Sequence, residues 1–99
     1  MIILLTSKQR SYLRAIANSQ DAIFQIGKAG ISPSFIEQIK EALEAREIVK
    51  ISVLDNIDLS AREACNIVTQ ETGADGVQVI GNKFVIYKRS KERPKIELP

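Results

Sequence analysis

Three features of the sequence predict an α/β fold with the element order α-β-α-β-α-β-β. Three segments repeat apolar residues at the helical spacing, and each follows a residue typical of a helix N-cap. Short apolar runs of strand length separate these segments. Near the end of the chain, Gly81-Asn82 joins two such runs in the manner of a two-residue hairpin turn. We therefore expect a four-stranded mixed sheet with the helices packed on it as a two-layer α+β structure.

The first half of the chain supplies two helices and one strand. The first helix is expected over 7–17, because Thr6-Ser7-Lys8-Gln9 has the form of a capping box. The first strand is expected over 22–26, and its nearly continuous apolar character predicts burial on both faces. The second helix follows Ser32-Pro33, since serine caps a helix and proline is tolerated in its first turn.

The second half supplies the remaining strands and one helix. The run 48–54 alternates apolar and polar residues, which predicts a strand. Ser60-Ala61-Arg62-Glu63 forms a second capping box, and Gly73 is a natural end for the helix that it starts. The runs 77–80 and 84–87 flank the Gly-Asn turn and complete the sheet as an antiparallel hairpin.

Composition indicates a single domain over residues 1–99, and it excludes several classes of site. The chain has 44% hydrophobic residues, enough for a modest core. One cysteine and no histidine exclude an internal disulfide framework and a Cys/His zinc centre, so we expect no metal and no cofactor. Cys65 falls on the apolar stripe of the third helix and is expected in the core. Met1–Leu5 is too short for a signal peptide or membrane span, which favours a cytoplasmic protein. We expect a monomer, because nothing in the sequence demands an oligomer.

Charge is segregated along the chain although the net charge is only +2. Residues 1–31 hold four basic residues and one acidic residue, a net +3. Residues 81–99 hold six basic and two acidic residues, a net +4, and 90–99 are expected to form a basic, flexible tail. The middle, 32–80, holds four basic and nine acidic residues, a net −5. If the two ends meet in space, they would form a positive face typical of nucleic-acid binding.

The loop Gly27-Lys28-Ala29-Gly30 lies between the first strand and the second helix. Glycine lets the backbone approach a ligand closely and tolerates positive φ. A helix N-terminus offers unpaired N–H groups and a partial positive charge, which suits a phosphate. The loop is too short for a nucleotide-binding P-loop, but it has the G-x-x-G form that clamps nucleic-acid backbone in KH-type domains.

The whole chain resembles the CRM domain (chloroplast RNA splicing and ribosome maturation), in its stand-alone bacterial YhbY-type form. This resemblance implies a fold like the C-terminal domain of translation initiation factor three. It also implies an RNA-binding module that associates with the precursor of the large ribosomal subunit, and so with its rRNA during ribosome assembly. The stretches that carry the resemblance are Leu5–Arg10, Gln25–Ser32, Glu71–Ala74, Val77–Arg89 and Lys91–Arg93.

The resemblance places the RNA contacts on the G-x-x-G loop and on the basic end of the last strand. Lys88 stands where the family pattern has arginine, so it keeps the charge but not the bidentate geometry. Basic residues of the first helix would extend the track. The residues predicted to bind RNA are Gly27, Lys28, Ala29, Gly30, Lys8, Arg10, Arg14, Lys88, Arg89 and Lys91.

The sequence leaves two alternative functions open, and it predicts no enzymatic activity. An RRM-like protein would read RNA on its sheet surface, but Phe84 and Tyr87 fall on opposite faces by alternation. A protein–protein adaptor would use the acidic face of the second helix, formed by Glu37, Glu41, Glu44 and Glu47. We expect no enzymatic activity, because the sequence offers no nucleophile–base pair and no metal set.

Overall fold

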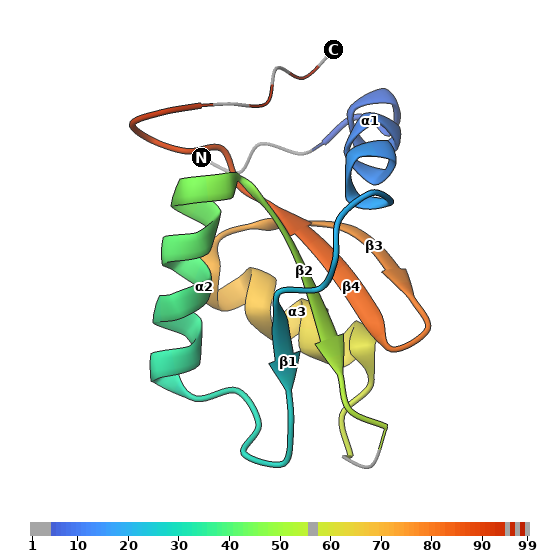
Figure 1. The fold of residues 1–99 in the computed structure, drawn as a ribbon, viewed down its shortest axis with the longest axis vertical. Helices are drawn as coiled ribbons and strands as arrows, with labels where there is room; N and C mark the ends of the chain where they lie inside the picture. Colours follow the sequence, from blue (N-terminus) through green and yellow to red (C-terminus); the bar gives the residue numbers. More distant parts are fainter. Residues whose placement is uncertain (1–4, 56–57, 95, 97, 99) are drawn as a thin grey trace.

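The computed structural model describes residues 5–55, 58–94, 96 and 98, and this part of the chain contains three helices and four strands (Figure 1). Their order confirms the predicted α-β-α-β-α-β-β sequence of elements. The elements are α1 (Ser7–Ala17), β1 (Phe24–Ile26), α2 (Pro33–Arg46), β2 (Ile48–Val53), α3 (Ala61–Thr72), β3 (Asp75–Ile80) and β4 (Lys83–Tyr87).

The strands form one mixed sheet in the order β1-β2-β4-β3, which confirms the predicted fold class. β1 runs parallel to β2, and α2 connects these two neighbours. β4 runs antiparallel to both β2 and β3, and Gly81-Asn82 closes the β3–β4 hairpin. The two central strands are therefore β2 and β4, and β1 lies at an edge.

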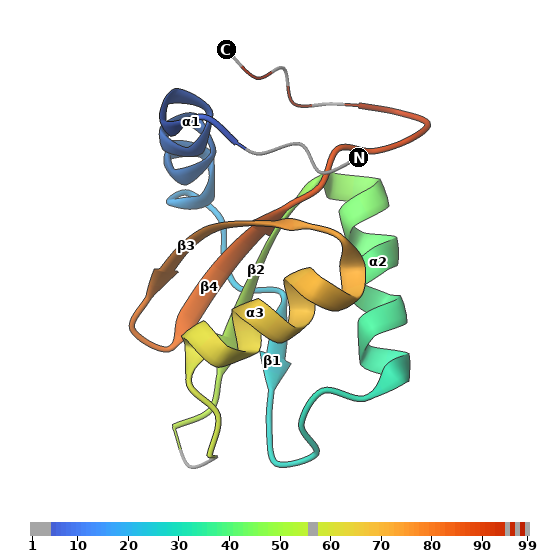
Figure 2. The ribbon, with the colours of Figure 1, turned by 180° about the vertical axis from the view of Figure 1, so that it is seen from behind.

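The helices cover both faces of this sheet. α2 and α3 pack on one face, where Ile39, Val68 and Phe84 belong to a large buried cluster. α1 packs on the other face, where Leu13 and Val85 belong to a second, smaller cluster. Figure 2 shows α3 in front of the sheet, whereas Figure 1 shows it behind. The expected two-layer arrangement is thus incomplete, because α1 adds a partial third layer over one end of the sheet.

Local signals set the helix ends as predicted. Thr6 and Gln9 form the first capping box, with both backbone–side-chain hydrogen bonds at 3.1 Å. Ser60 and Glu63 form the second, at 3.1 and 3.3 Å. Gly73 ends α3 in the left-handed conformation, with φ at 76°. Each of these signals acts within one helical turn, so the neighbouring sequence is enough to specify it.

The burial of β1 differs from the prediction. Ile26 is buried, but Gln25 is exposed and Ile23 is 41% exposed. The expectation that this strand is buried on both faces is therefore wrong. β1 is an edge strand, and α1 covers a different part of the face toward which Gln25 points.

β3 begins at Asp75 and contains a bulge, neither of which was predicted. Gly76 pairs with Ile86 and Gln78 pairs with Val85, so Val77 is an extra residue in the ladder. A bulge changes the phase of the alternation along a strand. This change puts Val77 in the α1 cluster and lets Val79 pack against the α2–α3 cluster.

Leu5, the first described residue of the N-terminal arm, packs into the core. Leu5 is buried in the α1 cluster, while 1–4 lie outside the described residues. In the part of the chain that is described, no helix has the length and apolar character needed to cross a membrane.

Candidate nucleic-acid interface

The Gly27–Gly30 loop forms a tight turn between β1 and α2, at the lower end of the molecule in Figure 1. The Gly30 N–H donates to the Gly27 carbonyl at 2.9 Å and closes the turn. Gly30 has φ at 73°, and a Cβ built there would meet open space. Lys28 and Ala29 stand exposed at the tip. Gly30 thus adopts the left-handed conformation that glycine tolerates without strain.

The underside of the loop is supported by neighbouring residues. A Cβ on Gly27 would lie 3.3 Å from Leu54 Cδ1, so the chain after β2 passes close beneath it. The Leu54 N–H donates to the Ile26 carbonyl at 3.0 Å. Phe24 and Phe35 pack edge to face, with ring centroids 5.6 Å apart, and this contact joins β1 to the first turn of α2. The loop is therefore held between two rigid elements.

The loop and the start of α2 together present hydrogen-bond donors to solvent. The Ser32 hydroxyl caps α2 by accepting from the Phe35 N–H at 3.1 Å. Among the described residues, no hydrogen-bond acceptor is recorded for the N–H groups of Lys28 and Ala29. These two donors, the Lys28 ammonium and the positive end of the α2 dipole suit a phosphate.

The basic residues of α1 lie far from this loop, near the opposite end of the longest axis (Figure 1). Arg14 Nη2 donates to the Ser11 hydroxyl at 2.9 Å, and Lys8 is exposed. Burial raises the pKa of Asp75, and the nearby Arg10 guanidinium lowers it in part. Arg10 therefore interacts electrostatically with the Asp75 carboxylate on β3.

Lys88, Arg89 and Lys91 lie beyond β4, beside the C-terminal half of α2. The Lys88 ammonium donates to the Thr72 carbonyl at 2.9 Å and so caps the last turn of α3. This bond places Lys88 on the α3 side of the sheet, opposite α1. The structure brings these three cations together, but it does not bring them next to α1 or the loop.

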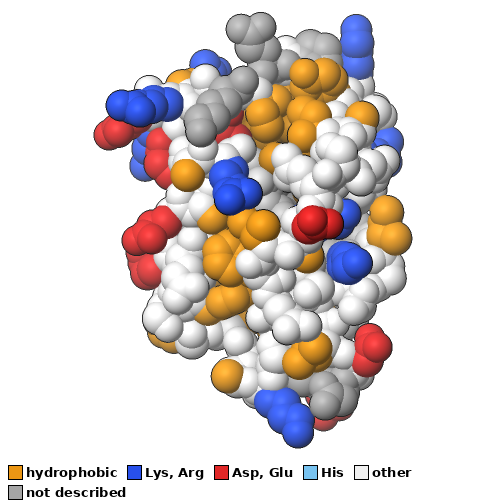
Figure 3. Space-filling model, in the orientation of Figure 1, with side chains coloured by type: hydrophobic (Ala, Val, Ile, Leu, Met, Phe, Trp, Pro, Cys, Tyr) orange, Lys and Arg blue, Asp and Glu red, His pale blue; other side chains and the backbone are white. Residues whose placement is uncertain are grey.

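The two ends of the chain do meet, as the charge pattern would require for a shared face. Ile96 and Leu98 pack against the cluster that contains Leu5 and Leu13. The basic residues nevertheless point to different surfaces. On the face shown in Figure 3, Lys and Arg side chains are scattered and alternate with Asp and Glu. The ten predicted contacts thus form three separate groups, and their role in binding RNA stays a prediction.

Sequence reasoning missed how Glu44 and Glu47 bind the C-terminal segment. Glu47 is fully buried, and its carboxylate accepts from the N–H groups of Ser90 at 2.9 Å and Ile96 at 2.7 Å. Glu44 accepts from the Ser90 hydroxyl and from the Lys91 N–H at 3.0 Å. These partners lie more than 40 residues away in sequence, so no local pattern could have revealed them.

These bonds also change the acidic face expected on α2. Glu47 has no exposed surface, and Glu44 is engaged by the C-terminal segment. Glu37 forms an ion pair with Lys40 at 3.4 Å. A continuous four-carboxylate surface for a basic protein partner is therefore absent among the described residues.

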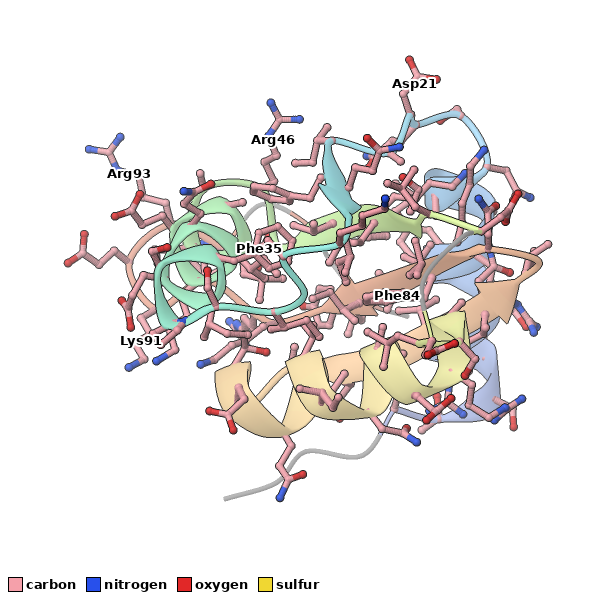
Figure 4. All side chains as sticks on the ribbon, turned by 90° about the horizontal axis from the view of Figure 1, so that it is seen from below. Asp21, Phe35, Arg46, Phe84, Lys91 and Arg93 are labelled. Atoms are coloured by element: carbon pink, nitrogen blue, oxygen red, sulfur yellow. The ribbon has the colours of Figure 1, made fainter. Side chains whose placement is uncertain are left out.

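Phe84 and Tyr87, the rings that an RRM-like protein would use to read RNA on its sheet, cannot stack on a base. Phe84 is 0% exposed between the sheet and α3 (Figure 4). Tyr87 is 4% exposed in the α1 cluster, and burial, with Glu47 nearby, raises its pKa. The predicted placement of the two rings on opposite faces is confirmed.

The described residues offer no centre for metal or thiol chemistry. No group of three or more potential ligands among them could hold a metal ion. Cys65 is buried, as predicted, and burial raises the pKa of its thiol. A raised pKa keeps a thiol protonated and weakly nucleophilic.

Comparisons with known proteins find one family model and several similar proteins with RNA-binding names. Residues 5–88 match the model of the CRS1/YhbY (CRM) domain. The chain is 45% identical over 96 residues to "Probable RNA-binding protein YqeI" of Bacillus subtilis, covering 97% of this chain and 100% of that one. It is 30% identical over 95 residues to "RNA-binding protein" of Haemophilus influenzae, covering 96% and 95%. The solution structure of a hypothetical Staphylococcus aureus protein, described as a candidate RNA-binding protein, matches with a TM-score of 0.79 and 47% identity, covering 97% and 100%.

Proposed function

Since this chain belongs to the CRS1/YhbY (CRM) domain family, we propose that it binds RNA and catalyses no reaction. Two similar proteins, from Bacillus subtilis and Haemophilus influenzae, carry RNA-binding names, which supports the proposal. The observation that carries it here is the geometry of the Gly27–Gly30 loop. That loop presents two backbone donors and a cation at the start of a helix, which is a suitable site for a backbone phosphate.

In this mechanism, phosphate contacts position the RNA and do not read its sequence. Gly30, where a Cβ would face open space, lets the sugar-phosphate chain approach the main chain, and Lys28 adds a point charge. Gly27 lets the loop pack closely on Leu54. Structured RNA would then be selected by its shape and by any unstacked bases. If about six phosphates are neutralised, log K should fall against log salt with a slope of roughly −4 to −5.

The family resemblance suggests which RNA is bound. We propose that it is rRNA of the precursor of the large ribosomal subunit, contacted during ribosome assembly. Crosslinking the protein in cells and sequencing the attached RNA tests this proposal. Reads should concentrate on large-subunit rRNA, and a map spread over unrelated messengers would contradict the ribosomal role without contradicting RNA binding.

We also propose that the protein acts as a monomer in the cytoplasm. The exposed large apolar side chains support this state, because those of Tyr12, Ile23, Ile67 and Ile80 belong to different parts of the fold rather than to one interface. Light scattering after size exclusion should give one chain per particle, and a concentration-independent dimer would contradict the proposal.

The loop is tested by the double substitution Lys28→Asp with Ala29→Asp. Both side chains are exposed, so the fold should survive while RNA affinity is lost. The matched control is Arg62→Asp with Asn66→Asp, which makes the same charge change on the exposed surface of α3. Filter binding and circular dichroism measure affinity and fold. Unchanged affinity in the loop variant would remove the loop from the mechanism.

A further inference from the structure

A hollow of about 260 Å³ opens at the edge of the sheet, because β1 is shorter than the strand that it pairs with. β2 runs over Ile48–Val53, but β1 pairs only with 51–53, so the first half of β2 has no strand beside it there. The chain before β1, the last turn of α2 and the first residues of β2 line the hollow. Figure 4 shows Asp21 and Arg46, two of the lining residues, projecting from the same side of the molecule, away from α3.

The wall that β2 contributes carries unpaired backbone groups. The Lys88 N–H donates to the Glu47 carbonyl at 2.9 Å, which fixes the alternation of bonds between β2 and β4. In this alternation the N–H and C=O groups of Ile48 and Lys50 point away from β4, toward the hollow. The Lys50 carbonyl accepts from the Ile23 N–H at 3.0 Å. Among the described residues, the other three groups, which are both groups of Ile48 and the Lys50 N–H, have no partner.

These unpaired groups form an edge that is complementary to a nucleobase. The N–H and C=O groups of one strand residue point the same way, so Ile48 presents a donor beside an acceptor. A base edge carries the matching acceptor and donor, as adenine does at N7 and N6. Ile48 is only 2% exposed, and nearly all buried backbone groups in proteins are paired. The edge therefore suits a planar polar ring that enters the hollow.

The side chains around this edge suit the same ligand. Arg46 is exposed and forms no ion pair with a described residue, and a guanidinium plane can stack on a base. Ile23 is 41% exposed and offers an apolar contact. The exposed Asp21 carboxylate can accept from a base N–H group. The Lys50 ammonium donates to the Gln20 carbonyl at 3.3 Å and so holds the wall of the hollow in place.

We propose that this hollow binds one unstacked nucleobase of the RNA strand that the Gly27–Gly30 loop contacts, an inference that rests on the proposed function. Ile23 and Gly27 flank β1 and are four residues apart, which corresponds to about 13 Å. A stacked strand advances about 3.4 Å per phosphate, so about four phosphates separate the two contacts. Residues 22–27 contain no charged side chain, so no carboxylate lies on this path. The loop holds the backbone, and the hollow selects a base.

The test compares four fluorescein-labelled RNA octamers by anisotropy: oligo(A), oligo(C), oligo(U) and alternating GU. The wild type should bind one of them at least about tenfold more tightly than the weakest. Arg46→Lys keeps the charge but removes the guanidinium plane, so this preference should largely disappear while affinity for the weakest octamer stays the same. The matched control is Arg62→Lys on the exposed surface of α3, which should keep the wild-type preference.

A second measurement follows the backbone edge directly. The amide signals of Ile48 and Lys50 in ¹H–¹⁵N spectra should move when the preferred octamer is added. Equal affinity for all four octamers, an Arg46→Lys variant with the wild-type preference, or amide signals that stay in place would overturn the inference and leave RNA binding intact. Signals that move with an extended Thr-Val-Thr-Val-Thr peptide and with no octamer would overturn it in favour of a protein partner. A wild-type protein that binds no RNA would overturn the proposed function as well.

Discussion

Replacing Glu47 with alanine should destabilise the protein more than any single surface substitution. The carboxylate is fully buried and accepts from the N–H groups of Ser90 and Ile96 at 2.9 and 2.7 Å. A hydrogen bond to a charged group contributes about 1.5–3 kcal/mol, so two such bonds give about 3–6 kcal/mol. Once the carboxylate is gone, the segment can move and its Ile96 N–H can reach water. We therefore expect the free energy of unfolding to fall by about 3 kcal/mol, toward the low end of that range.

A second substitution at the same position separates the carboxylate from the backbone. Glu47 has φ at 67°, a conformation that residues with a Cβ rarely adopt. Glu47→Gly also loses the carboxylate, but it relieves strain of about 1 kcal/mol. Urea unfolding followed by circular dichroism should therefore place the glycine variant between the wild type and the alanine variant. A loss below about 1 kcal/mol for alanine, or a glycine variant no more stable than alanine, would refute the reasoning.

Three further outcomes are expected. Hydrogen bonds lower the pKa of Glu44 in the folded state, so its contribution to stability is present above the ordinary glutamate pKa and is lost as the pH falls through the lowered value. The melting temperature of Glu44→Gln should accordingly fall less steeply on acidification, and parallel pH profiles would contradict this. Cys65 should react slowly with a thiol reagent in the native protein and rapidly in denaturant, whereas fast native labelling would show that it is not packed as described. Gly30→Ala should lower the free energy of unfolding by roughly 1 kcal/mol, because φ is 73° although space is open; unchanged stability would mean that the loop adopts another conformation.

The sequence predicts those parts of the fold whose cause is local. The capping boxes at Thr6 and Ser60 and the Gly81-Asn82 turn each involve residues within one turn of chain, and all three are confirmed. The burial of β1 depends on its place in the sheet, which no residue within the strand encodes. Apolar character in 22–26 therefore suggested a central strand, although β1 is an edge strand.

The candidate site likewise has features with local causes and features that depend on the tertiary fold. The position of the Gly27–Gly30 loop between a strand and a capped helix was predicted, because local residues determine it. The grouping of the basic residues depends on which face of the sheet α1 covers, and this could not be deduced from charge along the chain. The proximity of Lys40 to Lys91 could not be predicted either, because it depends on the path of the C-terminal segment.

The two buried clusters lie on opposite sides of the sheet. α1 and the C-terminal segment close the smaller cluster, whereas α2 and α3 close the larger one. Such a division gives the protein two cooperative units with different opening free energies. α1 can detach while α2 and α3 stay packed on the other face of the sheet, since the C-terminal segment is bound to Glu44 and Glu47. This partial opening would uncover Val85 and Tyr87, so amide protons of α1 should exchange with solvent well before those of α3.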